Sequence, residues 1–456
     1  MNGAPLTFDS IPREVVTTLE SHREVLTNLE WLLVNRDLNG RVRLIAPERV
    51  QSDEALRQGI EDLAATLAER LGVHGYPASR MVLYEASQEQ VRRGAAIVPL
   101  GGFENVFLVD RLATEGDWAN IADESPGPPR VVFFSIKGGV GRSTALAATA
   151  WWLAQAGKRV LVVDLDLESP GLSSSLLPTE RLPRFGVTDW LVEDLVENAE
   201  IVFKDMIATS GLAHDGEIIV VPAHGAEPGE YIAKLGRVWM PRVGQDGSRE
   251  AWFNRLRRLL AELEAHLHPD VVLLDCRAGL DEVASACIAQ LGARLVLLFA
   301  LDGTQTWNGY RMLFEHWRRA QVTEKIRERL QTVAALVPEM ERVSYLDGLR
   351  EHAHEVFRDT LYDEIPPAPE DDIGQEHMAG GGAWRVKKYV EGWNFDEADE
   401  QAPHAPWAVN WHRSFAGLYS LQGRLATIDT QEVRSIFGNM IDGIANAIGL
   451  DNNGRG

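Results

Sequence analysis

The chain contains little cysteine and no long apolar segment. Only Cys276 and Cys287 occur among its 456 residues, which excludes a disulfide framework or a four-cysteine zinc or iron–sulfur site within one chain. No run of about 18 or more uninterrupted apolar residues is present, so no membrane-spanning helix is expected. The first residues also lack a basic segment followed by an apolar one, so no secretory signal is predicted. These absences favour a cytoplasmic protein.

Positive charge is also scarce. The 45 Lys and Arg residues stand against 67 Asp and Glu residues, which gives a formal net charge of −22, and only 7 of the basic residues are lysines. Such a chain is not expected to bind nucleic acid or anionic lipid over a broad surface. Nucleic-acid binding through a local patch, with Arg255, Arg257 and Arg258 as candidates, stays open. The composition is otherwise that of an ordinary globular protein.

A proline- and glycine-rich segment divides the chain. Residues 123–130 read DESPGPPR, which disfavours helix and central strand, and the apolar run VVFFSI follows at once. We therefore place a boundary at about residue 128. Residues 1–128 are predicted to form a small α/β or α+β domain. Because they contain no recognisable metal cluster or nucleophile motif, we interpret them as a docking or regulatory domain of unknown function that contacts a protein partner.

The elements expected in this first domain follow from hydrophobic spacing. Apolar residues at helical spacing predict a helix over residues 12–38, and a second helix begins after the capping residues Ser52 and Asp53. Short apolar runs predict strands over the ranges 42–46, 81–84 and 106–109.

The second domain, residues 129–456, alternates apolar runs with helical patterns. Continuous runs of Val, Ile and Leu are typical of strands buried on both faces of a mostly parallel sheet. We therefore predict an α/β fold with that sheet flanked by helices. A Trp- and Pro-rich excursion at about residues 366–411 interrupts the pattern. The predicted strands cover residues 131–136, 160–163, 218–221, 271–274, 295–299 and 333–337.

The most informative segment is residues 131–154, which read VVFFSIKGGVGRSTALAATAWWLA. A buried strand is followed by a glycine-rich turn and then by a helix. Gly138, Gly139 and Gly141 allow the backbone to wrap closely around an anion, and the N–H groups at the start of the helix point toward it. The Ser143 hydroxyl can serve as a ligand for Mg²⁺. The segment therefore predicts a phosphate-binding loop.

The loop carries a family resemblance. KGGVGRST (137–144) resembles the deviant Walker A motif of the ParA/MinD superfamily of P-loop ATPases, usually written KGGxGK[ST]T. Residues 160–173, VLVVDLDLESPGLS, resemble the second strand and first switch of that family, and residues 271–282, VVLLDCRAGLDE, resemble its Walker B strand and second switch. The resemblance does not include the first 128 residues. It implies a fold of the P-loop NTPase type, and ATP and Mg²⁺ as cofactors.

Carried over position by position, the resemblance implies a role for each site residue. Lys137 would reach across a nucleotide-dependent homodimer to the phosphates of the facing subunit. Asp166 would orient or activate the attacking water, so Lys137 and Asp166 are the catalytic candidates. Mg²⁺ would be held by Ser143, Asp164 and Asp275. The nucleotide would be bound by Lys137, Gly138, Gly139, Val140, Gly141, Arg142, Ser143, Thr144 and Gly279.

Arg142 departs from the family pattern, which has lysine at this position. A guanidinium is longer, planar and forked, so its contacts with phosphates differ from those of an ammonium group. The substitution either preserves phosphate binding, in a chain with 38 Arg and 7 Lys, or slows or removes hydrolysis. We expect a slow ATPase switch that dimerises on nucleotide and regulates a partner in a bacterial defence or positioning system. A non-hydrolysing interaction module and a DNA-partitioning ATPase are the alternatives.

Overall fold

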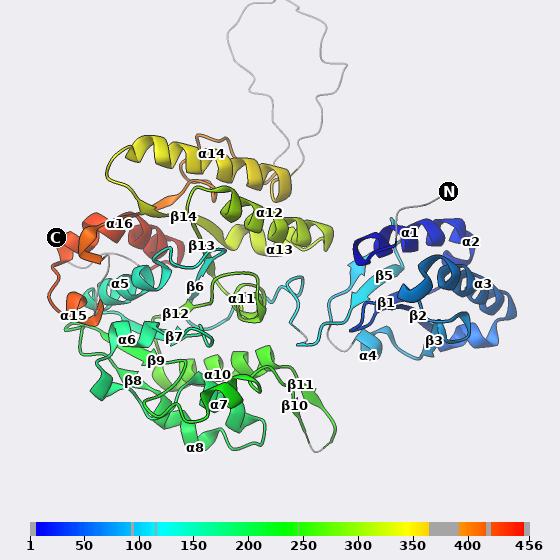
Figure 1. The fold of residues 1–456 in the computed structure, drawn as a ribbon, viewed down its shortest axis with the longest axis horizontal. Helices are drawn as coiled ribbons and strands as arrows, with labels where there is room; N and C mark the ends of the chain where they lie inside the picture. Colours follow the sequence, from blue (N-terminus) through cyan, green and yellow to red (C-terminus); the bar gives the residue numbers. More distant parts are fainter. Residues whose placement is uncertain are drawn as a thin grey trace, which may run out of the picture.

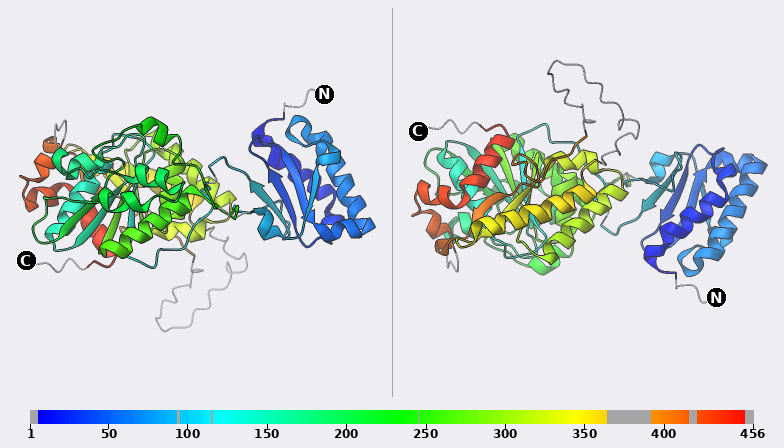
Figure 2. Two further views of the ribbon diagram at one scale, coloured as in Figure 1. Left: turned by 90° about the horizontal axis from the view of Figure 1, so that it is seen from below. Right: turned by 90° about the horizontal axis from the view of Figure 1, so that it is seen from above.

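The computed structural model describes residues 6–92, 95–114, 116–244, 246–363, 392–415 and 421–450. A five-stranded sheet lies before residue 111 and an eight-stranded sheet after residue 129, each with its own helices (Figure 1). The segment between them, residues 111–129, joins the two parts of the chain, which Figure 2 shows side by side along the long axis.

The first sheet has the strand order β3-β2-β1-β5-β4 and mixes parallel and antiparallel pairs. Its two long helices, α1 and α3, pack on each other. They contribute to an apolar core that is separate from the cores of the second sheet. The predicted cap of α3 is confirmed at Asp53, whose carboxylate accepts from the N–H groups of Ala55 and Leu56. The elements are α1 (Ile11–Ser21), α2 (Arg23–Leu26), β1 (Leu32–Arg36), β2 (Val42–Pro47), α3 (Glu54–Leu71), β3 (Val82–Glu85), α4 (Gln88–Arg92), β4 (Val98–Pro99) and β5 (Val106–Asp110).

The predicted helix over residues 12–38 is wrong beyond Leu26, where the short helix α2 ends. The helix α1 ends at Ser21, and the segment Leu32–Arg36, which begins with three apolar residues, forms the central strand of the sheet. In this strand Val34 is in register with Leu44 of β2 on one side and with Leu108 of β5 on the other. Burial and backbone pairing with two neighbours therefore override the helical spacing of the leucines.

The second sheet confirms the predicted fold class, a mostly parallel sheet flanked by helices. Its strand order is β15-β14-β13-β6-β12-β7-β9-β8, and only the edge strand β8 is antiparallel to its neighbour. The helices α10, α12 and α14 contribute to the apolar core on one face, and α5 and α16 to the core on the other. The strands are β6 (Arg130–Ser135), β7 (Arg159–Asp164), β8 (Ala208–Thr209), β9 (Glu217–Val221), β12 (Val271–Asp275), β13 (Leu295–Ala300), β14 (Leu330–Val337) and β15 (Trp407–Asn410).

The helices of this part follow the strands along the chain, with a small ribbon, β10 (Arg242–Val243) and β11 (Arg249–Glu250), inserted before α10. Within the described ranges no helix is long and apolar enough to cross a membrane. The helices are α5 (Arg142–Gln155), α6 (Leu172–Leu176), α7 (Val187–Asp194), α8 (Glu200–Phe203), α9 (Tyr231–Leu235), α10 (Trp252–Leu267), α11 (Glu282–Ser285), α12 (Thr304–Arg319), α13 (Thr323–Ile326), α14 (Arg342–Thr360), α15 (Leu421–Leu425) and α16 (Thr430–Ala447).

The predicted excursion at about residues 366–411 ends in a strand of the main sheet. Residues 364–391, including Trp384, lie outside the described part of the chain. The chain returns as β15, which pairs in parallel with β14 at the sheet edge and packs against α16. This return places Trp411 at the carboxyl edge of the sheet.

Candidate functional site

The glycine-rich turn lies between β6 and α5, at the carboxyl edge of the second sheet. Gly139 and Gly141 have φ angles of +75° and +78°, a left-handed conformation that side chains other than glycine adopt with strain. Gly141 is the N-cap of α5, so the first N–H groups of this helix open into the turn. The turn therefore has the backbone geometry of an anion cradle.

Two carboxylates lie beside the cradle on neighbouring strands. Asp164 ends β7 and Asp275 ends β12, and the two residues are directly in register in the parallel pair. Asp164 accepts hydrogen bonds from the N–H groups of Asp166 (3.2 Å) and Leu172 (3.1 Å). Burial, followed by repulsion from Asp275, raises the pKa of Asp164 to about 8, so this carboxyl group is mostly protonated at neutral pH.

Arg142 points beneath the cradle into these carboxylates. Its Nε atom donates to Asp275 Oδ1 at 2.8 Å, and a terminal nitrogen donates to Ser135 Oγ at 3.2 Å. The other terminal nitrogen lies 3.5 Å from Asp166 Oδ2. The side chains of Arg142 and Asp275 are almost fully buried, at 8% and 1% exposure. Burial raises the pKa of Asp166, and the charge of Arg142 opposes this rise.

The described side chains do not form a complete metal site by themselves. Among the described residues, no group of three or more His, Cys, Asp or Glu side chains could hold a metal ion. Magnesium at nucleotide sites takes most of its ligands from phosphates and water and one or two from the protein, so Ser143, Asp164 and Asp275 stay the predicted ligands. Ser143 is half-buried at the start of α5, but Asp275 is already paired with Arg142.

Lys137 and Gly279 are two further predicted site residues. Lys137 is exposed, and in the part of the chain that the structure describes it has no hydrogen bond or ion pair. Gly279 has a φ of +101°, and its N–H group donates to the carbonyl oxygen of Ser135 at 2.9 Å. This bond ties the predicted second switch to the strand that leads into the cradle.

A cavity of about 230 Å³ lies beside the cradle and was not predicted from the sequence. Its volume is below the range of about 300–1,000 Å³ that is typical of complete ligand pockets, so it suits one part of a ligand. Only the aromatic content of the excursion hinted at it. It is lined by Gly139, Gly141, Thr144, Leu336, Val409, Asn410, Trp411, His412, Phe415, Ile436 and Phe437.

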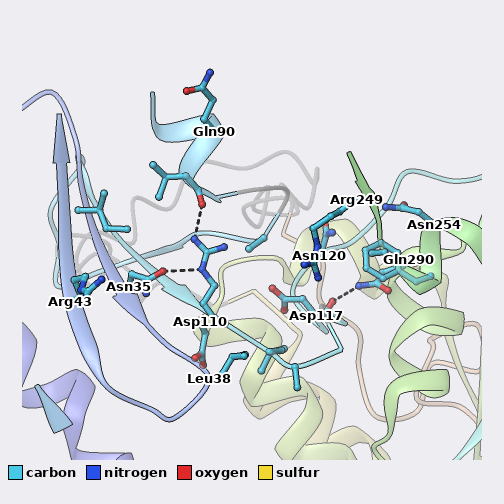
Figure 3. A pocket seen from close by; sticks show the side chains of 18 of the residues that line it. Asn35, Leu38, Arg43, Gln90, Asp110, Asp117, Asn120, Arg249, Asn254 and Gln290 are labelled. Atoms are coloured by element: carbon cyan, nitrogen blue, oxygen red, sulfur yellow. Dashed lines mark hydrogen bonds between the residues drawn. The ribbon is translucent and has the colours of Figure 1, made fainter. Parts of the chain in front are cut away.

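A larger cavity of about 890 Å³ lies between the first sheet and the second domain (Figure 3). Asn35 and Arg43 line it from the first sheet, and Asn254 and Gln290 line it from the second domain. The side chain of Gln290 donates to the carbonyl oxygen of Asp117 in the linker at 3.1 Å. Acidic and basic side chains are mixed in the lining, so charge alone does not select a ligand.

Two of the three arginines proposed as a local basic patch form ion pairs within the chain. Arg255 is fully buried and donates to Asp194 at 2.7 Å, and Arg258 pairs with Asp194 and Glu250. Of the three arginines only Arg257 is exposed. These residues therefore do not form a continuous basic surface for DNA.

The fold and the cradle define a parallel α/β domain with a phosphate-binding loop. Residues 129–176, which contain β6, the cradle and the first carboxylates, match the family of anion-transporting ATPases. Over 37 residues the chain is 57% identical to a protein of Aquifex aeolicus that is named as an arsenical pump-driving ATPase. That match covers 8% of this chain and 9% of the curated relative.

Solved structures give a general likeness of fold. A plasmid partition protein from Borrelia burgdorferi is 16% identical with a TM-score of 0.34, and the alignment covers 49% of this chain and 86% of that one. The septum site-determining protein MinD from Pyrococcus horikoshii, complexed with Mg-ADP, is 20% identical with a TM-score of 0.32, covering 47% and 72%. These values do not extend the likeness to activity.

Proposed function

We propose that this chain is an ATP-dependent molecular switch of the ParA/MinD type, which binds ATP, hydrolyses it slowly and dimerises on the nucleotide. The observation that carries the proposal is the cradle itself: Gly139 and Gly141 turn the backbone between a buried strand and a helix, directly beside Asp164 and Asp275. The local match to the anion-transporting ATPase family supports it.

Each residue of the site has a part in this proposal. The N–H groups of the cradle bind the β- and γ-phosphates, and Asp166 holds the attacking water at the edge of the site. A magnesium ion, when bound, would supply positive charge at the phosphates; Ser143 is a side chain that would hold it, and Asp275 could do so only where Arg142 releases its carboxylate. Asp164, protonated at neutral pH, acts as a buried group that orders the backbone of the first switch. Hydrolysis is expected to be slow because the charge of Arg142 is already engaged by Asp275 and Asp166.

The cavity lined by Asn410, Trp411 and His412 takes the nucleobase in this proposal. It is adjacent to Gly139, Gly141 and Thr144 of the cradle, so a nucleotide with its phosphates in the cradle places its base there. Trp411 offers an aromatic face, and the amide of Asn410 can hydrogen-bond to base edges. The first domain, residues 1–128, recruits a protein partner.

Isothermal titration with ATP and Mg²⁺ tests the proposal. We expect binding by the wild-type protein and weaker binding by Gly139→Val, in which a branched side chain would be forced into a left-handed conformation. Gly102→Val is the matched control, because Gly102 has a similar φ of +71° but belongs to the first domain. A well-folded wild-type protein that does not bind ATP would contradict the proposed function.

A non-hydrolysing nucleotide-dependent interaction module is the second candidate. It is favoured by the position of Arg142, which occupies Asp275 and lies 3.5 Å from Asp166, the residue proposed to hold water. Phosphate release by the wild type, Asp166→Ala and Lys137→Ala separates the candidates. A wild-type rate above both variants supports the ATPase, whereas equal background rates in all three proteins support the interaction module.

A further inference from the structure

The side chain of Arg142 is placed as a cation among the acidic residues of the site. Its guanidinium contacts three groups at once, Asp275, Asp166 and Ser135. These contacts come from three different strands or strand ends, β12, β7 and β6. Arg142 thus links the carboxylates of Asp275 and Asp166, two of the predicted site residues.

Burial strengthens the pairing of Arg142 with Asp275. Asp275 is 1% exposed, so its carboxylate has no water to stabilise it and needs a positive partner. The Nε–Oδ1 distance of 2.8 Å is that of a charge-assisted hydrogen bond. A metal ion at Asp275 would have to displace this bond or share the carboxylate with a second cation a few ångströms away, and like charges at such a distance repel strongly where water is excluded.

We propose that Arg142 is a built-in cation that competes with the divalent metal for Asp275, so that this chain binds nucleotide with little dependence on the metal. The inference rests on the proposed function, because it assigns a role to Arg142 within the same nucleotide site. It does not depend on whether the bound nucleotide is hydrolysed.

The competition has a consequence for the substitution at this position. Lysine carries its charge on a single ammonium group and cannot hold Ser135, Asp275 and Asp166 together as a planar guanidinium does. In Arg142→Lys the ion pair with Asp275 is weaker, so a metal ion can bind the carboxylate more easily. Metal dependence should therefore increase in the variant although the formal charge of the site is unchanged.

The first experiment measures ATP affinity by calorimetry with Mg²⁺ and with EDTA. We expect the wild-type dissociation constant to change by less than about threefold on removal of the metal, and that of Arg142→Lys to rise by about tenfold or more. Arg159→Lys is the matched control, because Arg159 pairs with Glu217 at the amino end of β7, on an exposed edge away from the cradle. It should behave as the wild type does.

Equal metal dependence in the wild type and Arg142→Lys would overturn the competition while leaving nucleotide binding, and hence the proposed function, intact. A second experiment decides the case in which the wild type binds no ATP at all. Mn²⁺ is titrated calorimetrically into nucleotide-free wild type, Arg142→Lys and Arg142→Met. Tighter Mn²⁺ binding by either variant than by the wild type supports the competition, and indistinguishable binding by all three contradicts it.

Discussion

At the scale of single residues, burial gives the three acidic side chains of the site different properties. Asp164 is enclosed between two strands and its pKa is raised to about 8 by burial and by Asp275. Asp275 is equally enclosed but has Arg142 as a direct partner. Asp166 is less buried, and Arg142 opposes the rise in its pKa that burial causes. The three aspartates of the site therefore differ in burial and in their contact with Arg142.

The raised pKa of Asp164 predicts a pH-dependent stability. Between about pH 4 and pH 8 the folded chain retains a proton on Asp164 that the unfolded chain has released, so the free energy of unfolding falls as pH rises through this window. The contribution is about 1.4 kcal/mol for each pH unit crossed. The Asn side chain in Asp164→Asn does not titrate. The thermal midpoint of this variant should therefore decline less from about pH 5 to pH 8 than that of the wild type. Parallel declines in calorimetry would show that Asp164 titrates normally.

Trp411 should contribute to affinity for the base and not for the phosphates. Stacking of a base on an aromatic side chain is worth about 1–3 kcal/mol, so Trp411→Ala should weaken ATP binding by that amount. Binding of inorganic triphosphate, which has no base, should be unchanged in the same variant. Trp411 is 43% exposed, so its replacement is not expected to unfold the protein. Equal losses for both ligands in calorimetric titrations would place the base elsewhere.

At the scale of elements, the sequence was sufficient where one segment carries its own signal. Six predicted strands of the second domain and the turn after β6 are encoded by contiguous apolar runs and by glycines, so local patterns find them. The strand β1 was missed because its identity depends on pairing with β2 and β5. The pairing of Arg142 with Asp275 was missed for a similar reason: the residues are 133 positions apart and meet only through the sheet.

The cavity proposed for the base depends on an element that the sequence did not predict as a strand. The chain returns as β15 after a long excursion and brings Asn410 and Trp411 to the cradle. No spacing rule connects these residues to the glycines of the turn. Only the parallel pairing of β15 with β14 and the packing of α16 place them together.

The contact between α16 and β15 should be sensitive to side-chain volume. A Cβ atom at Gly443 would lie 2.5 Å from the ring of Trp407, whereas one at Gly438 of the same helix would approach only the flexible side chain of Arg434. Gly443→Ala should therefore destabilise the protein by about 1–3 kcal/mol. Gly438→Ala, the control, should be neutral or stabilising through helix propensity. Denaturant unfolding that ranks the two variants in the opposite order would contradict this packing.

At the scale of the whole molecule, the linker is anchored to the segment that follows the predicted second switch. The N–H group of Ala122 donates to the carbonyl oxygen of Ala289 at 2.7 Å, and Gln290 donates to Asp117. Both acceptor and donor belong to a short π-helical segment, Ala286–Gln290, which continues directly from α11. Such segments occur frequently at functional sites. A movement of the second switch would therefore act on the linker that carries the first domain.

The proposed nucleotide-dependent homodimerisation would depend on the charge of the whole molecule. With a net charge of −22 per chain, two copies repel each other, so a dimer needs positive charge at its interface. Lys137 is exposed and unpaired within the described ranges, which leaves its ammonium group available for the phosphates of a facing copy.

Lys137→Ala should weaken the ATP-dependent dimer by about tenfold or more but change ATP binding by the monomer less. Lys204→Ala, an equal loss of charge on the exposed segment after α8, should dimerise as the wild type does. Light scattering with a slowly hydrolysed ATP analogue measures both. A wild type that stays monomeric at saturating analogue, or a Lys137→Ala variant that dimerises equally well, would show that Lys137 does not reach across the interface.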